Sequence, residues 1–262
     1  MSETDYESRL KLAVDAAKEA GELILKYYQT DDIGLESKSD ASPVTVADRG
    51  AEELLRVRIG DAFPDDGILG EEFPPKEGTN GYRWILDPID GTKCFVAGTP
   101  LFGTLIGIER DGEMIAGVCR FPALDEVVYA REGGGAWFQT RDNEPKAARV
   151  SSVDQIEKSL GCFTELAGWF KIERKELFDN LARSARAIRG WGDCYGHMLV
   201  ATGRAEFSID PLMSPWDIAA LIPIVREAGG YCGDWKGNTI IDGGNGVSTN
   251  AMMKDKILGM LK

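Results

Sequence analysis

Between Gly67 and Gln139 the sequence breaks into short runs of β-forming residues, with Gly or Pro between them. This density predicts a mostly antiparallel sheet. The predicted strands are Gly67–Gly70, Arg83–Asp87, Phe102–Glu109, Met114–Phe121, Glu126–Ala130 and Ala136–Gln139.

Helical periodicity flanks this strand-rich region on both sides. Apolar residues at steps of three and four predict helices from Glu7 to about Tyr28 and from Val46 to about Ala62. Past about Val150 helices and strands alternate over longer distances. Ser214 as N-cap and Gly229-Gly230 after the last turn delimit the final predicted helix. These later elements are helices near Arg174–Ala185 and Tyr195–Thr202, a strand at Ala205–Ile209 and a helix at Pro215–Glu227.

Charge limits the partners of this chain. Its formal net charge is −13, and both nucleic acid and anionic membranes bind proteins through Lys and Arg, so neither is expected. A phosphorylated substrate would also be repelled, unless clustered carboxylates hold cations at the site. The N-terminal segment 1–7 lacks the basic and apolar regions of a secretory signal, and no run of about 20 apolar residues occurs. We therefore expect a cytoplasmic protein.

The five cysteines are odd in number and contain no C-x-x-C pair. This spacing argues against zinc and redox chemistry. We expect reduced thiols that fill space in the core.

Three acidic segments stand at the ends of predicted strands or at the start of a helix, where sites gather in α/β folds. They are Gly70-Glu71-Glu72, Asp87-Pro88-Ile89-Asp90-Gly91-Thr92 and Pro215-Trp216-Asp217. In the second, Pro88 disfavours a continued strand, and a tight turn would bring the carboxylates of Asp87 and Asp90 together.

The same hexapeptide offers further ligands. The Ile89 carbonyl can join the carboxylates, because hard divalent cations accept both kinds of oxygen. Gly91 and Thr92 would open a helical turn whose free N–H groups favour phosphate. Two cations about 4 Å apart would activate a water and neutralise phosphoryl oxygens.

Each acidic segment alone also has a structural explanation. The spacings Thr45-x-x-Asp48 and Ser214-x-x-Asp217 are close to capping boxes, and Glu71 and Glu72 suit a solvated strand edge. No turn, however, requires two acids around Pro-Ile followed by Gly-Thr. The hexapeptide therefore favours a metal and phosphate site.

Several phosphatase classes are excluded. The only histidine, His197, lies in a predicted helix as a packed or surface side chain, which argues against a histidine nucleophile and a Ser-His-Asp triad. No cysteine has an arginine six residues later, and the chain contains no Asp-x-Asp, P-loop or G-x-G-x-x-G motif. Hydrolysis by a metal-activated water remains.

These segments in this order, with Trp216-Asp217-Ile218-Ala219-Ala220 and Glu227-Ala228-Gly229-Gly230 after them, resemble the inositol monophosphatase family over nearly the whole chain. The resemblance implies an α/β (α+β) fold arranged as a layered α/β/α/β/α sandwich, a homodimer, and two or three Mg²⁺ ions per site. Lys38 matches a lysine of a loop that helps to hold a further magnesium ion. By position, the resemblance implies Glu71, Asp87, the Ile89 carbonyl, Asp90 and Asp217 as metal ligands, Asp48, Thr92 and Glu71 as catalytic residues, and Asp90, Gly91, Thr92 and Asp217 as substrate-binding residues.

Two stretches resemble the histidinol-phosphate phosphatase branch: Lys93 to Ile106 and Arg189 to Gly196. Histidinol phosphate carries an ammonium and an imidazole, so its pocket should offer acceptors and a planar surface. We expect Asp193, Asp210 and Trp191 to supply these, and Arg189 to anchor phosphate. The structural alternatives are a core position for Trp191, a helix N-cap for Asp193 and a turn for Asp210. Cys94, where that branch usually has Ser, should change the geometry of the site's edge.

The sequence thus predicts a magnesium-dependent phosphomonoester hydrolase acting on L-histidinol phosphate. Inositol monophosphate or another sugar phosphate is the alternative substrate, and a non-catalytic, metal-responsive binding protein is the alternative of another class. We expect one catalytic unit of two lobes. Residues 1–147 carry most metal ligands, and residues 148–262 carry Asp217 and the specificity residues.

Overall fold

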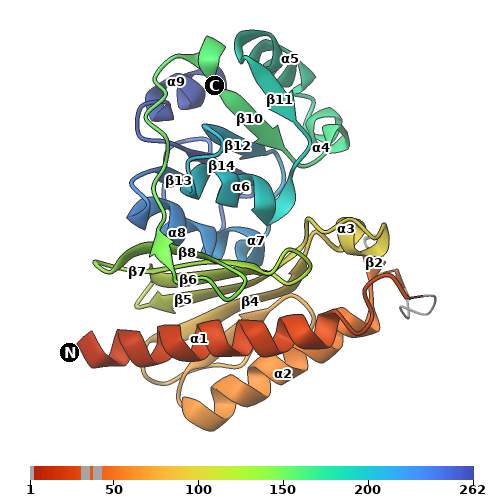
Figure 1. Cartoon of the computed structure of the whole chain (residues 1–262), viewed down its shortest axis with the longest axis vertical. Coiled ribbons are helices and arrows are strands. Elements are labelled where there is room, and N and C mark those ends of the chain that lie inside the picture. Colours follow the sequence, from red (N-terminus) through yellow and green to blue (C-terminus); the bar gives the residue numbers. More distant parts are fainter. Residues whose placement is uncertain (1–2, 31–35, 38–42) are drawn as a thin grey trace.

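The computed structural model describes residues 3–30, 36–37 and 43–262. Its elements stack in five layers, helices and sheets in turn (Figure 1), which confirms the predicted α/β/α/β/α sandwich. None of the helices within the described ranges combines the length and apolarity needed to cross a bilayer. The outer layers are α1 (Glu3–Ile24) with α2 (Val46–Ala62), and α4 (Leu166–Lys171) with α5 (Lys175–Ser184) and α9 (Lys254–Met260); between the sheets lie α6 (Asp193–Ala201), α7 (Pro215–Ala219) and α8 (Leu221–Glu227).

The first sheet has seven strands in chain order, β3 to β9. All neighbouring pairs are antiparallel except β3 with β4, so the predicted mostly antiparallel sheet is confirmed. The positive φ angles of Asp111 and Gly112 allow the two-residue turn between β5 and β6. The strands are β3 (Gly67–Gly70), β4 (Tyr82–Asp90), β5 (Gly103–Arg110), β6 (Glu113–Phe121), β7 (Glu126–Arg131), β8 (Gly135–Thr140) and β9 (Lys146–Ala147).

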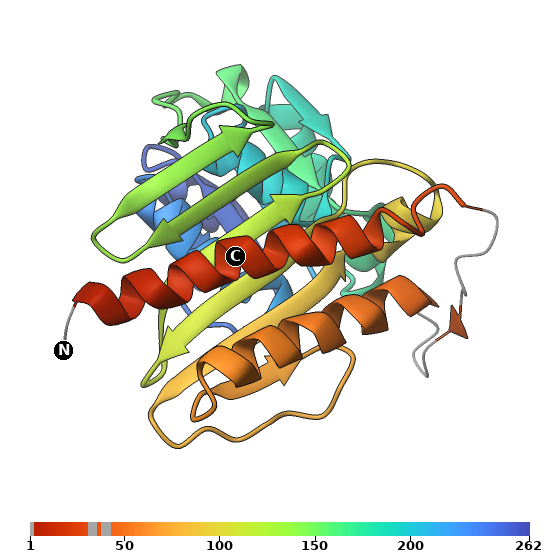
Figure 2. The same ribbon diagram turned by 60° about the horizontal axis from the view of Figure 1, so that its bottom comes forward.

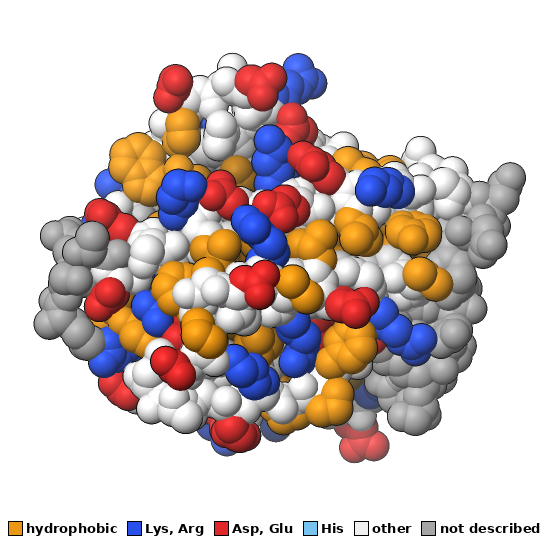
Figure 3. Space-filling model, turned by 90° about the horizontal axis from the view of Figure 1, so that it is seen from below, with side chains coloured by type: hydrophobic (Ala, Val, Ile, Leu, Met, Phe, Trp, Pro, Cys, Tyr) orange, Lys and Arg blue, Asp and Glu red, His pale blue; other side chains and the backbone are white. Residues whose placement is uncertain are grey.

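Helices α1 and α2 cover the outer face of this sheet (Figure 2). Ala13, Ala17, Ala20 and Ile24 recur on one side of α1 and are fully buried, because small side chains at this period let the helix approach the strands closely. On the side of the molecule seen from below, acidic and basic side chains are interspersed (Figure 3).

The second sheet is mixed, with the order β11-β10-β12-β14-β13. The sequence predicts only one of its strands, at Ala205–Ile209, close to the observed β12 (Phe207–Asp210). The other four contain three or four residues each, too few for an alternating pattern to stand out. They are β10 (Leu160–Phe163), β11 (Ala187–Arg189), β13 (Tyr231–Gly233) and β14 (Gly246–Thr249). In addition, β1 (Glu36–Ser37) and β2 (Pro43–Val44) form a small antiparallel pair.

The single helix predicted at Pro215–Glu227 is wrong, because the chain forms α7 and α8 with a break at Ala220. Pro223 has no N–H to donate to the carbonyl of Ala219, and a proline ring conflicts with that carbonyl in a continuous helix. The break lies directly on β6: a Cβ added at Gly117 would be 2.2 Å from the Ala220 carbonyl oxygen. This close approach seats the middle layer on the first sheet.

All five cysteines are free. Four of them are buried, as expected for thiols that fill core space, and Cys94 is partly exposed. The seven-stranded sheet ends at Ala147 and the five-stranded sheet begins at Leu160. A division into lobes at 147 fits this arrangement and stays a prediction.

Candidate active site

Three aspartates from two elements meet at one end of β4. Asp87 and Asp90 belong to that strand, and Asp217 lies in the first turn of α7. Each offers a carboxylate oxygen, and these three atoms lie within 4.8 Å of one another. The structure therefore brings residues from both halves of the chain into one acidic cluster, defined here as Asp87, Asp90 and Asp217.

A β-bulge brings Asp87 and Asp90 together. The predicted strand end at Asp87 is wrong, because β4 continues to Asp90 with a shift in its register against β5 between the two aspartates. The shift leaves Pro88 outside the regular ladder, where its missing N–H costs no strand-pairing bond. The Thr104 hydroxyl donates to the Pro88 carbonyl at 2.9 Å and holds the bulge.

Capping boxes orient Asp217 of the cluster and one further carboxylate, that of Asp48. Asp48 in α2 accepts the Thr45 N–H at 2.8 Å, and Asp217 in α7 accepts the Ser214 N–H at 2.7 Å. Each bond occupies one carboxylate oxygen and leaves the other available. The capping boxes expected from the sequence are thus confirmed. They position the two carboxylates and do not exclude a catalytic or metal-binding role for them.

Glu71 follows β3, and α2 fixes the backbone around it. Glu52 is fully buried, and its Oε2 accepts the Glu72 N–H at 2.8 Å. The Arg56 Nε donates to the Glu52 Oε1 at 2.7 Å, and its Nη2 donates to the Phe73 carbonyl at 3.0 Å. Sequence reasoning missed Glu52, although an acid on the apolar face of an amphipathic helix could have revealed it.

Like charges dominate this site. Burial raises the pKa of Asp87 well above its usual range, and the charges of Glu71, Asp90 and Asp217 raise it further. Burial followed by the charge of Asp193 raises the pKa of Asp90. Burial is also the main reason that the pKa of Asp217 reaches about 7. Asp87 is buried and Asp90 and Asp217 are partly buried, and carboxylates this close together need protons or cations beside them.

The residues of the acidic cluster fit a hard divalent cation. The Asp87 Oδ1 is buried and has no hydrogen-bond partner among the described residues. Carboxylate oxygens only accept, and such an acceptor-only group suits Mg²⁺, which prefers oxygen ligands. Glu71 borders the cluster, because its charge acts on both Asp87 and Asp217.

The start of α3 (Thr92–Val96) adjoins the cluster, as predicted. Gly91 is its N-cap with a φ of 84°, in the left-handed region that favours glycine. A Cβ at Gly91 would lie 3.0 Å from the Leu101 carbonyl oxygen and 3.3 Å from the Asp193 Oδ2. The Thr92 hydroxyl donates to the Ile89 carbonyl at 3.1 Å, which leaves that carbonyl a second lone pair for a cation.

Asp193 joins the site from α6. It is the first residue of that helix, so the alternative of an N-cap is wrong by one position, because Gly192 takes that place. Burial and the charge of Asp210 raise the pKa of Asp193 to about 6. The Cys94 thiol lies 3.7 Å from the Asp193 Oδ2. The residue that departs from the expected Ser thus contacts a predicted substrate ligand.

Asp210 is held inside the protein. Its Oδ1 accepts the Thr164 N–H at 3.0 Å, and its Oδ2 lies 2.8 Å from the His197 Nε2. The Nδ1 of His197 lies 2.7 Å from the Ser248 Oγ, and the ring is fully buried. The packed position predicted for His197 is confirmed. A direct contact of Asp210 with substrate stays a prediction.

Arg189 is the last residue of β11 and Trp191 follows it by two positions, and both lie at the surface. The Trp191 side chain is 40% exposed, so the alternative of a core tryptophan is wrong. Arg189 is exposed, and its Nη1 donates to the neighbouring Ile188 carbonyl at 2.8 Å. Their contacts with substrate stay predictions. Lys38 lies outside the described residues.

Comparison with known proteins identifies this arrangement. The model of the inositol monophosphatase family matches residues 5–261. A histidinol-phosphatase from Chlorobaculum parvum is 47% identical over 253 residues, 96% of each chain, and one from Mycobacterium tuberculosis is 38% identical over 96% of this chain and 97% of its own. The crystal structure of the extragenic suppressor protein suhB from Bartonella henselae has a TM-score of 0.88 at 30% identity and covers 97% of this chain and 98% of its own. The chain belongs to the inositol monophosphatase family.

Proposed function

We propose that this chain is a magnesium-dependent phosphomonoester hydrolase and that L-histidinol phosphate is its substrate. The observation that carries the chemistry is the acidic cluster with the buried, unpartnered Oδ1 of Asp87. The two relatives named histidinol-phosphatase, each similar over nearly their whole length, support the substrate.

Asp87, Asp90, Asp217, Glu71 and the Ile89 carbonyl would hold two or three Mg²⁺ ions. Bound there, the cations would supply positive charge for the phosphoryl oxygens and for the leaving alkoxide, and would acidify a water. The chain itself needs no covalent intermediate. Oxygen from water forms the new bond to phosphorus as the bond to the substrate alcohol breaks.

Asp48 and Thr92 orient the attacking water in this proposal. Burial raises the pKa of Asp48 to about 6, close to the pH at which a general base works well. The capping bond to Thr45 fixes one of its oxygens and leaves the other to accept the proton of the water. Free N–H groups at Gly91 and Thr92 would receive phosphate.

The cationic part of the substrate would face the second lobe. Asp193 and Asp210 would accept hydrogen bonds from the ammonium and imidazole groups, and the exposed ring of Trp191 would provide a planar surface. Arg189 would anchor phosphate. Inositol phosphate offers these carboxylates only neutral hydroxyl donors, whereas histidinol phosphate offers charged donors, so their presence favours histidinol phosphate.

A substrate panel tests the proposal. Steady-state kcat/KM is measured with saturating Mg²⁺ for L-histidinol phosphate, inositol 1-phosphate and a simple sugar phosphate. We expect histidinol phosphate to exceed the others by about 100-fold, since the proposed charge-assisted contacts with Asp193 and Asp210 would distinguish it. A preference for inositol phosphate would be consistent with phosphomonoester hydrolysis but would contradict histidinol phosphate as the substrate. No phosphate release in a single turnover with any ester would favour the metal-responsive binding protein.

Glu52→Gln should reduce magnesium affinity or turnover about 10- to 100-fold, the usual effect of removing a group that orients a metal ligand. The amide weakens the acceptor for the Glu72 N–H and breaks the ion pair with Arg56. Titrating the activity of the variant with Mg²⁺ measures both its magnesium affinity and its turnover. The matched control is Glu53→Gln, because Glu53 is the exposed neighbour on the same helix. Equal magnesium dependence in both variants would contradict the positioning role of Glu52.

A homodimer and a cytoplasmic location complete the proposal. The homodimer comes from the resemblance to the family, and both the homodimer and the location stay predictions. Light scattering of the purified chain gives the mass of the assembly.

A further inference from the structure

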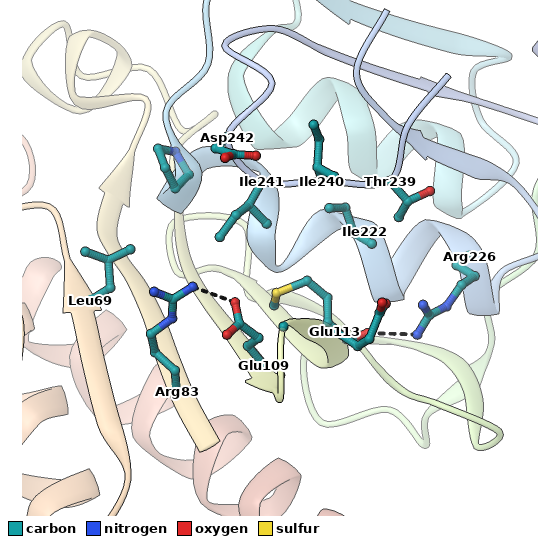
Figure 4. Close-up of a pocket in the computed structure, with 13 residues that line it drawn as sticks. Leu69, Arg83, Glu109, Glu113, Ile222, Arg226, Thr239, Ile240, Ile241 and Asp242 are labelled. Atoms are coloured by element: carbon teal, nitrogen blue, oxygen red, sulfur yellow. Dashed lines mark hydrogen bonds and ion pairs between the residues drawn. The ribbon is translucent and has the colours of Figure 1, made fainter. Parts of the chain in front are cut away.

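A cavity of about 430 Å³ lies between the first sheet and the middle helical layer. Strands of the sheet form one side of it, and α8 with segment 239–242 forms the other (Figure 4). Its volume is in the range of small-molecule sites. No residue assigned above to metal, phosphate or substrate lines this cavity. It is therefore a separate site.

An ion pair stands on the sheet side of the cavity. The Arg83 Nη2 lies 2.6 Å from the Glu109 Oε2, and the Glu109 side chain is only 12% exposed. The Nε–H of Arg83 is buried and has no acceptor in the part of the chain that the structure describes. The pair uses one nitrogen and one oxygen, so both groups retain hydrogen-bonding capacity. A partly shielded positive charge and negative charge thus stand side by side.

Apolar side chains lie opposite this ion pair in the cavity. Ile222 of α8 is 1% exposed, and Ile241 points into the cavity from the segment above it (Figure 4). Leu69 of β3 adds to this wall. At the far end, Arg226 donates to the Met114 carbonyl at 2.9 Å. Glu113, Thr239 and Asp242 also line the cavity, so it combines charges of both signs with an apolar surface.

We propose that this cavity binds a free α-amino acid with an apolar side chain. Its carboxylate would accept from Arg83, its ammonium would donate to Glu109, and its side chain would pack on Ile222 and Ile241. A plain anion would be repelled by Glu109 and a plain cation by Arg83, whereas a zwitterion aligned against the pair gains from both. Opposite charges beside hydrocarbon thus select this class of ligand.

The cavity adjoins the metal-binding residues along the chain. Leu69 on its wall precedes Glu71 by two residues, and Pro215 on its wall precedes Asp217 by two. A ligand that spans the cavity therefore fixes the spacing between β3 and α7, which contribute carboxylates from the two halves of the chain. Binding here couples to metal affinity, and this coupling is reciprocal.

Isothermal titration calorimetry tests the proposal on the whole chain, once in chelator and once in Mg²⁺. The probes are the twenty proteinogenic amino acids, with succinate as a plain anion and butylamine as a plain cation. We expect at least one apolar amino acid to bind, with affinities that differ about fivefold between the two conditions. Because the readout is binding, it does not depend on the ester that the enzyme hydrolyses. No amino acid binding, or equal binding of succinate or butylamine, overturns the proposal.

Variants locate the site. Arg83→Met and Glu109→Gln should weaken binding at least about tenfold, and Ile241→Trp should abolish it by filling the cavity with the charges intact. Arg58→Met and Glu19→Gln are matched controls, because Arg58 and Glu19 form a similar surface pair at 3.1 Å elsewhere on the fold. Should Arg83→Met fail to fold, the other two variants decide. Unchanged binding in Glu109→Gln and Ile241→Trp refutes the assignment.

Discussion

Asp87→Asn is expected to lower magnesium-dependent kcat/KM by at least about 10³-fold, equivalent to about 4 kcal/mol of transition-state stabilisation. Asp87 is 2% exposed and its Oδ1 has no partner within the described residues. An amide offers one neutral oxygen where the carboxylate offers two charged ones, so the site loses both a ligand and the charge that attracts cations. Phosphate release across a magnesium series measures the loss.

The same variant should make the metal-free protein more stable. Burial and then the repulsion from Glu71, Asp90 and Asp217 raise the pKa of Asp87, and removing its charge relieves both. Thermal unfolding in chelator should therefore show a higher midpoint for Asp87→Asn than for the wild type, and Mg²⁺ should stabilise only the wild type. Asp142→Asn, at an exposed loop position, is the control. If Asp87→Asn kept magnesium-dependent turnover and Mg²⁺ still raised its unfolding midpoint, the acidic cluster would have no role in the mechanism.

The parts of the fold that the sequence predicts are those with a strong local pattern. α2 was predicted at Val46–Ala62 and β3 at Gly67–Gly70, and both are observed at those bounds. A repeated apolar period and a cluster of turn residues identify such elements without knowledge of their neighbours. The hexapeptide predicts the convergence of Asp87 and Asp90, and the resemblance to the family adds Asp217; the structure brings the oxygens of all three together.

The remaining parts depend on contacts between distant residues. The bulge at Pro88 requires the pairing of β4 with β5, which no local pattern specifies. Gly117 of the first sheet lies against the Ala220 carbonyl of the middle helical layer. The hydrogen bond from the Glu72 N–H to the Glu52 carboxylate joins residues twenty positions apart. Helix periodicity predicts that position 52 is buried, but the partner that makes a buried acid tolerable is visible only in the fold.

Without metal, the free energy of unfolding should fall as the pH rises from about 4 to 7. Burial raises the pKa of Asp48 to about 6 and that of Asp217 to about 7, whereas an aspartate in an unfolded chain titrates near about 3.9. Between these values the folded protein binds more protons than the unfolded chain, so each step upward in pH favours unfolding. The cost by pH 7 is on the order of a few kcal/mol. Asp87 and Asp90, with pKa values raised well above the usual range, extend the fall to higher pH.

Magnesium should reverse this dependence, since cations replace protons beside the same carboxylates. The stabilisation by saturating Mg²⁺ should therefore be small at pH 5 and large at pH 8, because fewer protons compete at the higher pH. Urea unfolding at pH 5 and at pH 8, each in chelator and in Mg²⁺, measures the free energy of unfolding under the four conditions. Asp217→Asn should make the profile in chelator less steep, because Asp48, Asp87 and Asp90 still contribute, whereas the exposed Asp142→Asn should leave it unchanged. A metal-free stability that rose between pH 5 and 8 would mean that another positive group already neutralises the cluster, and the case for cations at Asp87, Asp90 and Asp217 would fall with it.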